Sequence, residues 1–126
     1  MTTKKFSQIL SLSVCIFAIA GTASAETTIG RWCDIPIQGK SDYNSIKELV
    51  VADNGDVELR SQHGDGSKRT EKLVEKDASH YLTLNKHGEK YRIVPGSGDL
   101  ELSDADGPFR VATKLGNTPR SGECGF

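Results

Sequence analysis

The stretch Thr28-Ile29-Gly30-Arg31-Trp32-Cys33 (residues 28–33) contains the only Trp of the 126-residue chain. Its spacing predicts an extended strand in which Gly30 and Trp32 point to one face and Cys33 points to the other. Because Gly30 has no side chain, it leaves room for the indole of Trp32 to lie flat on the strand. We therefore expect the rest of the chain to fold around this strand.

Residues 1–25 have the pattern of a secretory signal peptide. Two lysines precede an apolar run over residues 9–20, and Ala23-Ser24-Ala25 supplies the small residues that a signal peptidase accepts. The apolar run is too short to span a bilayer, so we expect no membrane span in the mature chain. The sequence thus predicts an exported protein, periplasmic or secreted, that begins near Glu26.

The remaining chain, residues 26–126, is long enough for one small domain. Without the two lysines of the signal peptide it has 14 basic and 17 acidic residues, so its formal net charge is −3. Charges of both signs alternate, as in Lys68-Arg69-Thr70-Glu71-Lys72, which is typical of a solvated surface. This distribution provides no basic region that would bind nucleic acid. We also expect the protein to be a monomer.

The cysteine count predicts one disulfide. Cys15 belongs to the signal peptide, which leaves Cys33 and Cys124 as an even pair in an exported chain. Their bond would close a loop of about ninety residues, for which the chain-entropy model gives roughly 4 to 5 kcal/mol of stabilisation. A redox-active pair would require two cysteines close in sequence, so a structural role is favoured.

Turn residues divide residues 26–126 into about eight short segments, most of them with the alternation of strands. The strongest hairpin signal is Asn54-Gly55, between a strand over residues 45–51 and another over residues 56–61. Lys68–Lys76 is predicted to be a strand at an exposed edge of the sheet, where its charged side chains protect it from pairing with another chain. Further strands are expected over residues 80–84, 90–94, 99–103 and 109–115.

This pattern predicts an all-β fold, either an antiparallel up-and-down barrel or a sandwich. The disulfide favours the barrel, because it requires the first strand to lie within about 7 Å of the residues beyond the last. We expect side chains to fill the barrel, including Trp32, Tyr91, Ile93 and Phe109.

The last strand and the segment after it complete the predicted domain. Phe109, Val111, Thr113 and Leu115 are expected to share one face of the last strand. The tail, residues 116–126, has no periodicity, and we expect Cys124 alone to hold it.

No metal site is predicted. His63, His80 and His87 lack the spacing that zinc requires, and His80 is expected to be a strand residue facing solvent. The acidic turn Asp104-Ala105-Asp106-Gly107 is similar to the middle of a calcium loop. A calcium loop would need an Asp at position 102 and a bidentate Glu at position 113, but the sequence has Leu102 and Thr113 there. A hairpin turn therefore explains these residues.

No catalytic or cofactor-binding residue is predicted either. Ser97 lies between two glycines, but in a loop between antiparallel strands rather than in the strand-to-helix turn that exposes a hydrolase serine. The sequence Gly64-Asp65-Gly66-Ser67-Lys68 lacks the residue order of a phosphate loop. We therefore expect a protein that is not an enzyme.

The Gly30-x-Trp32 opening and the late hairpin Leu100-Glu101-Leu102-Ser103-Asp104-Ala105-Asp106-Gly107 together resemble the bacterial inhibitors of serralysin-type metalloproteases. The resemblance covers two strands at the ends of the chain and implies a small eight-stranded barrel that blocks a zinc protease with its N-terminal trunk. Only Glu26–Ile29 precede Gly30, and the long-range cysteine pair differs from the short-range disulfide of that family. No inhibitory residue is therefore assigned by the resemblance.

Three functions follow as hypotheses. The first is a protein-binding or inhibitor-type module that acts on a protein of the bacterial envelope. The second is a lipocalin-like carrier of a small ligand, which would require a cavity of a few hundred Å³ inside the barrel. The third, a hydrolase, would require a pocket in which His63 or His80 meets a serine or a carboxylate.

Overall fold

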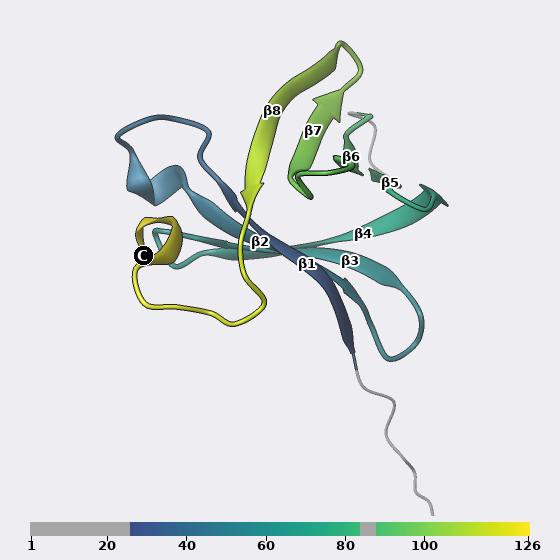
Figure 1. The fold of residues 1–126 in the computed structure, drawn as a ribbon, viewed down its shortest axis with the longest axis horizontal. Helices are drawn as coiled ribbons and strands as arrows, with labels where there is room; N and C mark the ends of the chain where they lie inside the picture. Colours follow the sequence, from purple (N-terminus) through teal and green to yellow (C-terminus); the bar gives the residue numbers. More distant parts are fainter. Residues whose placement is uncertain (1–25, 84–87) are drawn as a thin grey trace, which may run out of the picture.

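A computed structural model describes residues 26–83 and 88–126, so the predicted signal peptide and His87 lie outside the described residues. The described chain forms an antiparallel barrel in which each strand pairs with the next and β8 returns to β1 (Figure 1). The barrel predicted from the sequence is thus confirmed. The strands are β1 (Thr27–Asp34), β2 (Ser45–Val51), β3 (Val57–His63), β4 (Lys68–Asp77), β5 (His80–Thr83), β6 (Lys90–Ile93), β7 (Leu100–Asp104) and β8 (Gly107–Lys114).

The hairpins follow the turn signals of the sequence. The β2–β3 hairpin turns at Asn54-Gly55, where Gly55 has a φ of 89° that an L side chain rarely adopts. The charged strand predicted at Lys68–Lys76 is present as β4. Its predicted place at an exposed edge was wrong, because β4 pairs with β3 on one side and with β5 on the other.

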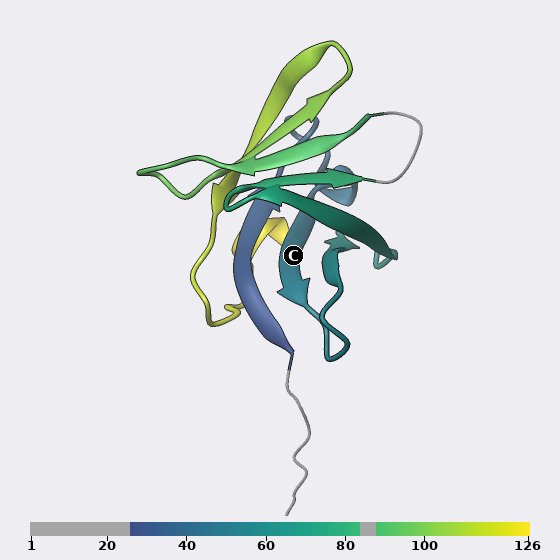
Figure 2. The same ribbon diagram turned by 90° about the vertical axis from the view of Figure 1, so that its right-hand side faces the viewer.

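The barrel closes through a short seam, which we define as the pairing of β1 with β8. Only Trp32 and Cys33 of β1 are paired there, with Lys114 and Thr113 of β8. One further hydrogen bond extends the seam, from the Leu115 N–H to the Arg31 carbonyl at 2.8 Å. Figures 1 and 2 show that the β7–β8 hairpin continues well beyond the point at which β8 crosses β1.

Trp32 is the largest buried side chain of the core and lies on Gly30. A Cβ placed on Gly30 would be 2.6 Å from the ring carbon Cη2 of Trp32, so only glycine fits beneath the indole. The indole N–H donates a hydrogen bond to the Gly98 carbonyl at 2.7 Å, which satisfies its one polar group. The rest of the core comes from the other seven strands: Leu49, Leu59, Leu73, Tyr81, Tyr91, Leu100, Leu102 and Ala112, with Val57 and Ile93 partly buried against them.

The prediction for β8 was wrong in one respect. Phe109, expected inside the barrel, is 52% exposed, and Val111 is 53% exposed, whereas Ala112 is buried. An irregularity between Leu102 and Ser103 in the β7–β8 pairing leaves Phe109 as the extra residue of a bulge. The inward face of β8 instead carries Ala112 and Arg110, and the guanidinium of Arg110 is held by a buried carboxylate of β1.

Candidate functional site

The interior of the barrel is apolar around Trp32 and polar beyond it. Asp34 is two residues after Trp32 on β1, so it points into the same interior, and only 2% of it is exposed. On β2, Lys47 likewise shares the inward face with Leu49 and is buried. Charged side chains therefore occupy core positions on both strands. We call the following residues the polar cluster: Asp34, Ser45, Lys47, Ser61 and Arg110.

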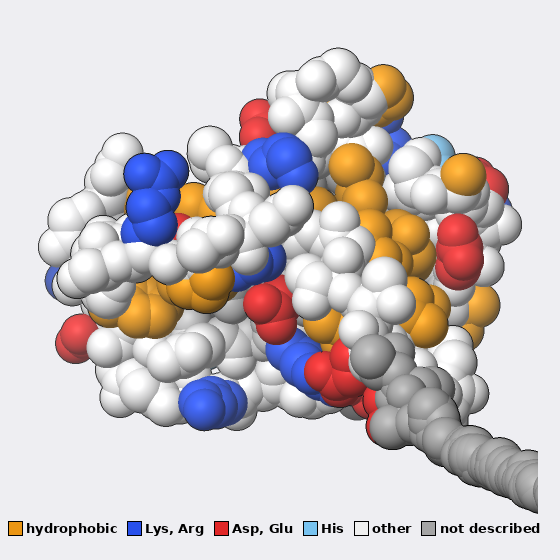
Figure 3. Space-filling model, turned by 60° about the horizontal axis from the view of Figure 1, so that its bottom comes forward, with side chains coloured by type: hydrophobic (Ala, Val, Ile, Leu, Met, Phe, Trp, Pro, Cys, Tyr) orange, Lys and Arg blue, Asp and Glu red, His pale blue; other side chains and the backbone are white. Residues whose placement is uncertain are grey.

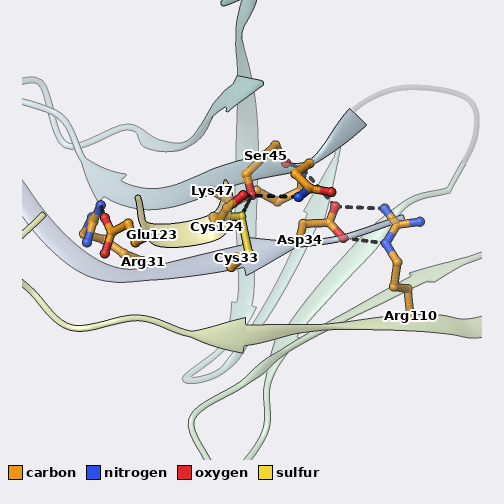
Figure 4. Close-up of a disulfide and its surroundings, with 9 residues drawn as sticks. Arg31, Cys33, Asp34, Ser45, Lys47, Arg110, Glu123 and Cys124 are labelled. Carbon is orange, nitrogen blue, oxygen red and sulfur yellow. Dashed lines mark hydrogen bonds and ion pairs between the residues drawn. A yellow bond between two sulfur atoms is a disulfide. The ribbon is translucent and has the colours of Figure 1, made fainter. Parts of the chain in front are cut away.

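The polar cluster is connected by hydrogen bonds and ion pairs (Figure 4). Arg110 donates two hydrogen bonds to the Asp34 carboxylate, at 2.5 and 2.9 Å. The Lys47 ammonium lies 3.2 Å from the same carboxylate and donates to the hydroxyl oxygens of Ser45 (2.9 Å) and Ser61 (3.4 Å). Strands β1, β2, β3 and β8 are thus tied together inside the barrel.

Two opposing effects act on the pKa of Lys47. Burial lowers its pKa, and the nearby Asp34 carboxylate acts in the opposite direction. Its ammonium donates to the hydroxyl oxygens of Ser45 and Ser61 and lies beside the Asp34 carboxylate. Lys47 thus contacts residues of β1, β2 and β3.

A small cavity of about 110 Å³ adjoins the polar cluster. Tyr91, which lines it, donates a hydrogen bond from its hydroxyl to Glu71 at 3.0 Å. Burial and the neighbouring Glu71 carboxylate raise the pKa of the Tyr91 phenol. The cavity has room for a few water molecules and is well below the few hundred Å³ that a carrier of the lipocalin-like kind requires.

Large apolar side chains are exposed on β8 and at the end of β1. Ile35 directly follows Asp34, and Phe109 and Val111 flank Arg110, the residue that binds Asp34. The β1–β2 loop, residues 35–44, exposes two more. The exposed fractions are 45% for Ile35, 45% for Ile37, 56% for Tyr43, 52% for Phe109 and 53% for Val111. We call these five residues the apolar surface.

The disulfide predicted from the sequence joins Cys33 to Cys124, with 5.4 Å between their Cα atoms. The tail is held by more than this bond, which corrects the expectation that Cys124 alone would fix it. Arg31 donates to the Gly116 carbonyl at 2.8 Å and forms an ion pair with Glu123. This contact lowers the pKa of the Glu123 carboxyl, because the guanidinium favours its charged form.

The tail in turn braces the β1–β2 loop. The side-chain amide of Asn44 donates to the Cys124 carbonyl at 3.1 Å, and the Gly64 N–H donates to the Asn44 carbonyl at 3.0 Å. A Cβ on Gly64 would lie 2.2 Å from the Ser41 carbonyl oxygen, so the β3–β4 turn packs directly against the loop. The end of the loop at residues 41–44 is therefore held, while Ile35, Ile37 and Tyr43 remain exposed.

The candidate residues of the sequence analysis are not brought together. His63 lines the small cavity, whose lining also includes Ser61 and Glu71. His80 begins β5 and is bonded through Nδ1 to Asp77 at 2.6 Å within one exposed turn, which lowers the pKa of the Asp77 carboxyl. The Ser97 hydroxyl accepts the Asp99 N–H at 3.2 Å, which is a local turn contact.

The acidic turn Asp104–Gly107 joins β7 to β8, and the Asp104 carboxylate accepts the Asp106 N–H at 2.9 Å. Among residues 26–83 and 88–126, no group of three or more His, Cys, Asp or Glu side chains is placed to hold a metal ion. Over the same residues, no helix is both long and apolar enough to cross a bilayer.

Sequence reasoning missed the polar cluster. The available signal was the position of Lys47, which alternates with Leu49 on the inward face of β2, and of Arg110, which alternates with Ala112 on β8. A charged residue in register with core residues indicates a buried partner. That partner, Asp34, directly follows the stretch 28–33 that predicts the first strand, and nothing in the sequence paired it with Arg110.

Comparisons with known proteins do not assign a family. No protein-family model matches this chain, and no curated protein or solved structure matches it significantly.

Proposed function

We propose that this chain is an exported, non-enzymatic domain that binds a protein of the bacterial envelope through the apolar surface. The observation that carries the proposal is the exposure of five large apolar side chains on β8, at the end of β1 and in the β1–β2 loop. Exposed apolar surface on a folded domain is typical of protein interaction sites. The inhibitor-type activity that the family resemblance implies is one form of this function.

The bracing of the β1–β2 loop supports the same proposal. Binding is weakened when a loop has to be ordered, and less so when the loop is already fixed. Here Asn44 is bonded both to the tail and to the β3–β4 turn. These contacts therefore fix the end of the loop that carries Tyr43 before a partner arrives.

The backbone edge of β8 favours contact through side chains rather than the addition of a partner strand. Beyond the seam, Pro108 lacks an N–H, Phe109 lies in a bulge, and Arg110 points a charge inward. These are the devices by which proteins protect a strand edge from pairing with another chain. A complementary protein face that buries Phe109 and Val111 against apolar side chains of its own fits this surface.

Site-specific photo-crosslinking in the native envelope tests the proposal. A photoreactive phenylalanine analogue is placed at Tyr43, at Val111 and, as a control, at Val74, which is 45% exposed on β4, four strands away from β8 in the barrel order. We expect Tyr43 and Val111 to crosslink to the same protein and Val74 not to do so.

A second set of variants defines the surface. Phe109→Ser with Val111→Ser should abolish the crosslink from Tyr43, whereas Val74→Ser should leave it intact. Equal capture from all three positions would indicate non-specific contact and contradict the proposal. So would the absence of any partner together with turnover of a substrate by the purified protein in an activity screen.

A further inference from the structure

A groove of about 510 Å³ lies outside the barrel, between the tail and the outer faces of β2, β3 and β4. Its lining includes Ser61 of the polar cluster and no residue of the apolar surface. One wall consists of strand residues that include Ile46, Lys68 and Arg69, and the other consists of tail residues that include Arg120 and Phe126. On the face shown in Figure 3, hydrophobic side chains line a hollow beside basic ones.

The charges in this groove are unequal. Five of its lining residues are basic and two, Glu48 and Glu123, are acidic. Both of these acids bind Arg31, whereas two other basic residues bind acids outside the groove, Arg60 with Glu58 and Arg69 with Glu71. Lys68 and Arg120 remain, and neither forms an ion pair with a carboxylate within residues 26–83 and 88–126.

The two cations belong to opposite walls of a groove that is already formed. Lys68 begins β4, and Arg120 belongs to the tail, which the Cys33–Cys124 bond and the Arg31 contacts hold against β1. Ile46, Pro119 and Phe126 add apolar surface between them. A volume of this size and a mixture of apolar lining with a few charged groups are typical of small-ligand sites.

We propose that the groove binds a small anionic ligand with an apolar portion. Its carboxylate or phosphate group would bind Lys68 and Arg120, and its apolar part would lie over Ile46 and Phe126. This proposal does not depend on protein binding by the apolar surface, which lies on other residues.

Calorimetric titration of the oxidised protein tests the proposal with four probes of equal chain length. Decanoate and decyl phosphate carry the two possible anionic groups, decanol is neutral, and decyltrimethylammonium is cationic. We expect at least one anion to bind with an affinity that falls as salt is added, since exposed charges are screened. Decanol and the cationic probe should bind about ten-fold more weakly or not at all. Whichever anion binds more tightly identifies the preferred group.

Substitutions locate the site. Lys68→Gln and Arg120→Gln should each weaken binding of the anion about five-fold, as expected for partly exposed charge-assisted contacts. Lys72→Gln is the matched control: it removes the same charge from the same strand, but Lys72 does not line the groove. Cys124→Ser should also weaken binding, because it releases the tail wall.

Three results would overturn the proposal: no binding of either anion, binding of decanol as tight as that of the anions, or equal effects of Lys68→Gln and Lys72→Gln. The far-ultraviolet circular dichroism of each variant confirms that the barrel has folded. None of these results bears on crosslinking from Tyr43 and Val111, so the two proposals fail independently.

Discussion

Arg110 and Asp34 form a two-point ion pair inside the barrel, at 2.5 and 2.9 Å, beyond the last residues of β1 and β8 that pair as strands. The carboxylate of Asp34 also meets Lys47. One buried acid thus neutralises two cations on two different strands, and it extends the closure of the barrel past the short backbone ladder.

Asp34→Asn should therefore destabilise the protein strongly. It leaves Lys47 and Arg110 without their carboxylate, and breaking a buried ion pair from one side typically costs about 3–5 kcal/mol. Urea unfolding followed by circular dichroism gives the change in the free energy of unfolding.

Asp56→Asn is the control, because the Asp56–Lys72 pair, at 3.2 Å, is exposed and should contribute less than about 1 kcal/mol. The triple variant Asp34→Leu, Lys47→Met, Arg110→Met should recover much of the loss. A cost for Asp34→Asn no greater than that for Asp56→Asn would show that the buried cluster contributes little.

Gly30→Ala should destabilise the protein by about 1–3 kcal/mol, the usual cost of overpacking a core. The added methyl would meet the indole of Trp32, which would have to move away from the Gly98 carbonyl. The fluorescence spectrum of the only Trp reports this movement, and urea unfolding reports the cost.

Gly116→Ala provides the comparison, because a Cβ there meets nothing within 4 Å and its φ is not in the left-handed region. Its effect should stay within about 0.5 kcal/mol. Unchanged Trp fluorescence in Gly30→Ala would mean that the indole does not lie on Gly30 in solution.

Loss of the disulfide should cost about 2–5 kcal/mol of stability. Cys33→Ser, Cys124→Ser and the double variant should be equally destabilised, because each removes the same bond. The tail should then become the first segment to exchange its amide protons, since only Arg31 and Asn44 would still hold it.

Mass spectrometry of non-reduced peptides checks the pairing itself. A disulfide-linked pair of peptides, one with Cys33 and one with Cys124, is expected from protein isolated under non-reducing conditions. Two free thiols, or a bond between two chains, would contradict the topology of the barrel.

The stability of the protein should fall above pH 10, in part through Tyr91. Its pKa is raised in the folded state by burial and by Glu71, so the folded phenol keeps its proton where the unfolded phenol, with a pKa of about 10, loses it. The contribution is complete below pH 10 and is lost as the pH rises further.

Tyr91→Phe isolates this contribution from that of Lys47, whose lowered pKa acts in the opposite direction. The difference in unfolding free energy between the natural chain and Tyr91→Phe should become smaller between pH 9 and pH 11. A constant difference over this interval would show that Tyr91 titrates alike in both states.

The strands and turns were predictable because they depend on local patterns. Asn54-Gly55 marks a hairpin, and the alternation of β3 and β7 separates an inward face from an outward one. The closed barrel also followed, because the pairing of Cys33 with Cys124 requires the chain ends to meet.

The orientation of β8 was not predictable in the same way. Alternation places Val111, Thr113 and Leu115 on one face, but it does not say which face is inward when the other carries a charge. Arg110 lies inward because its guanidinium binds the carboxylate of Asp34, which is 76 residues earlier in the chain. The candidate sites depend on such long-range pairs, so neither the apolar surface nor the groove could be read from the sequence.

The disulfide also constrains when this protein can complete its folding. Strands β1 to β8 pair in the order in which they are synthesised, so each hairpin can form from neighbouring segments with little loop closure. Cys33 and Cys124 are 91 residues apart, and the second follows the last strand of the barrel. The native bond cannot form until all eight strands have emerged. Formation of the native disulfide therefore indicates that β8, the last strand, has been synthesised.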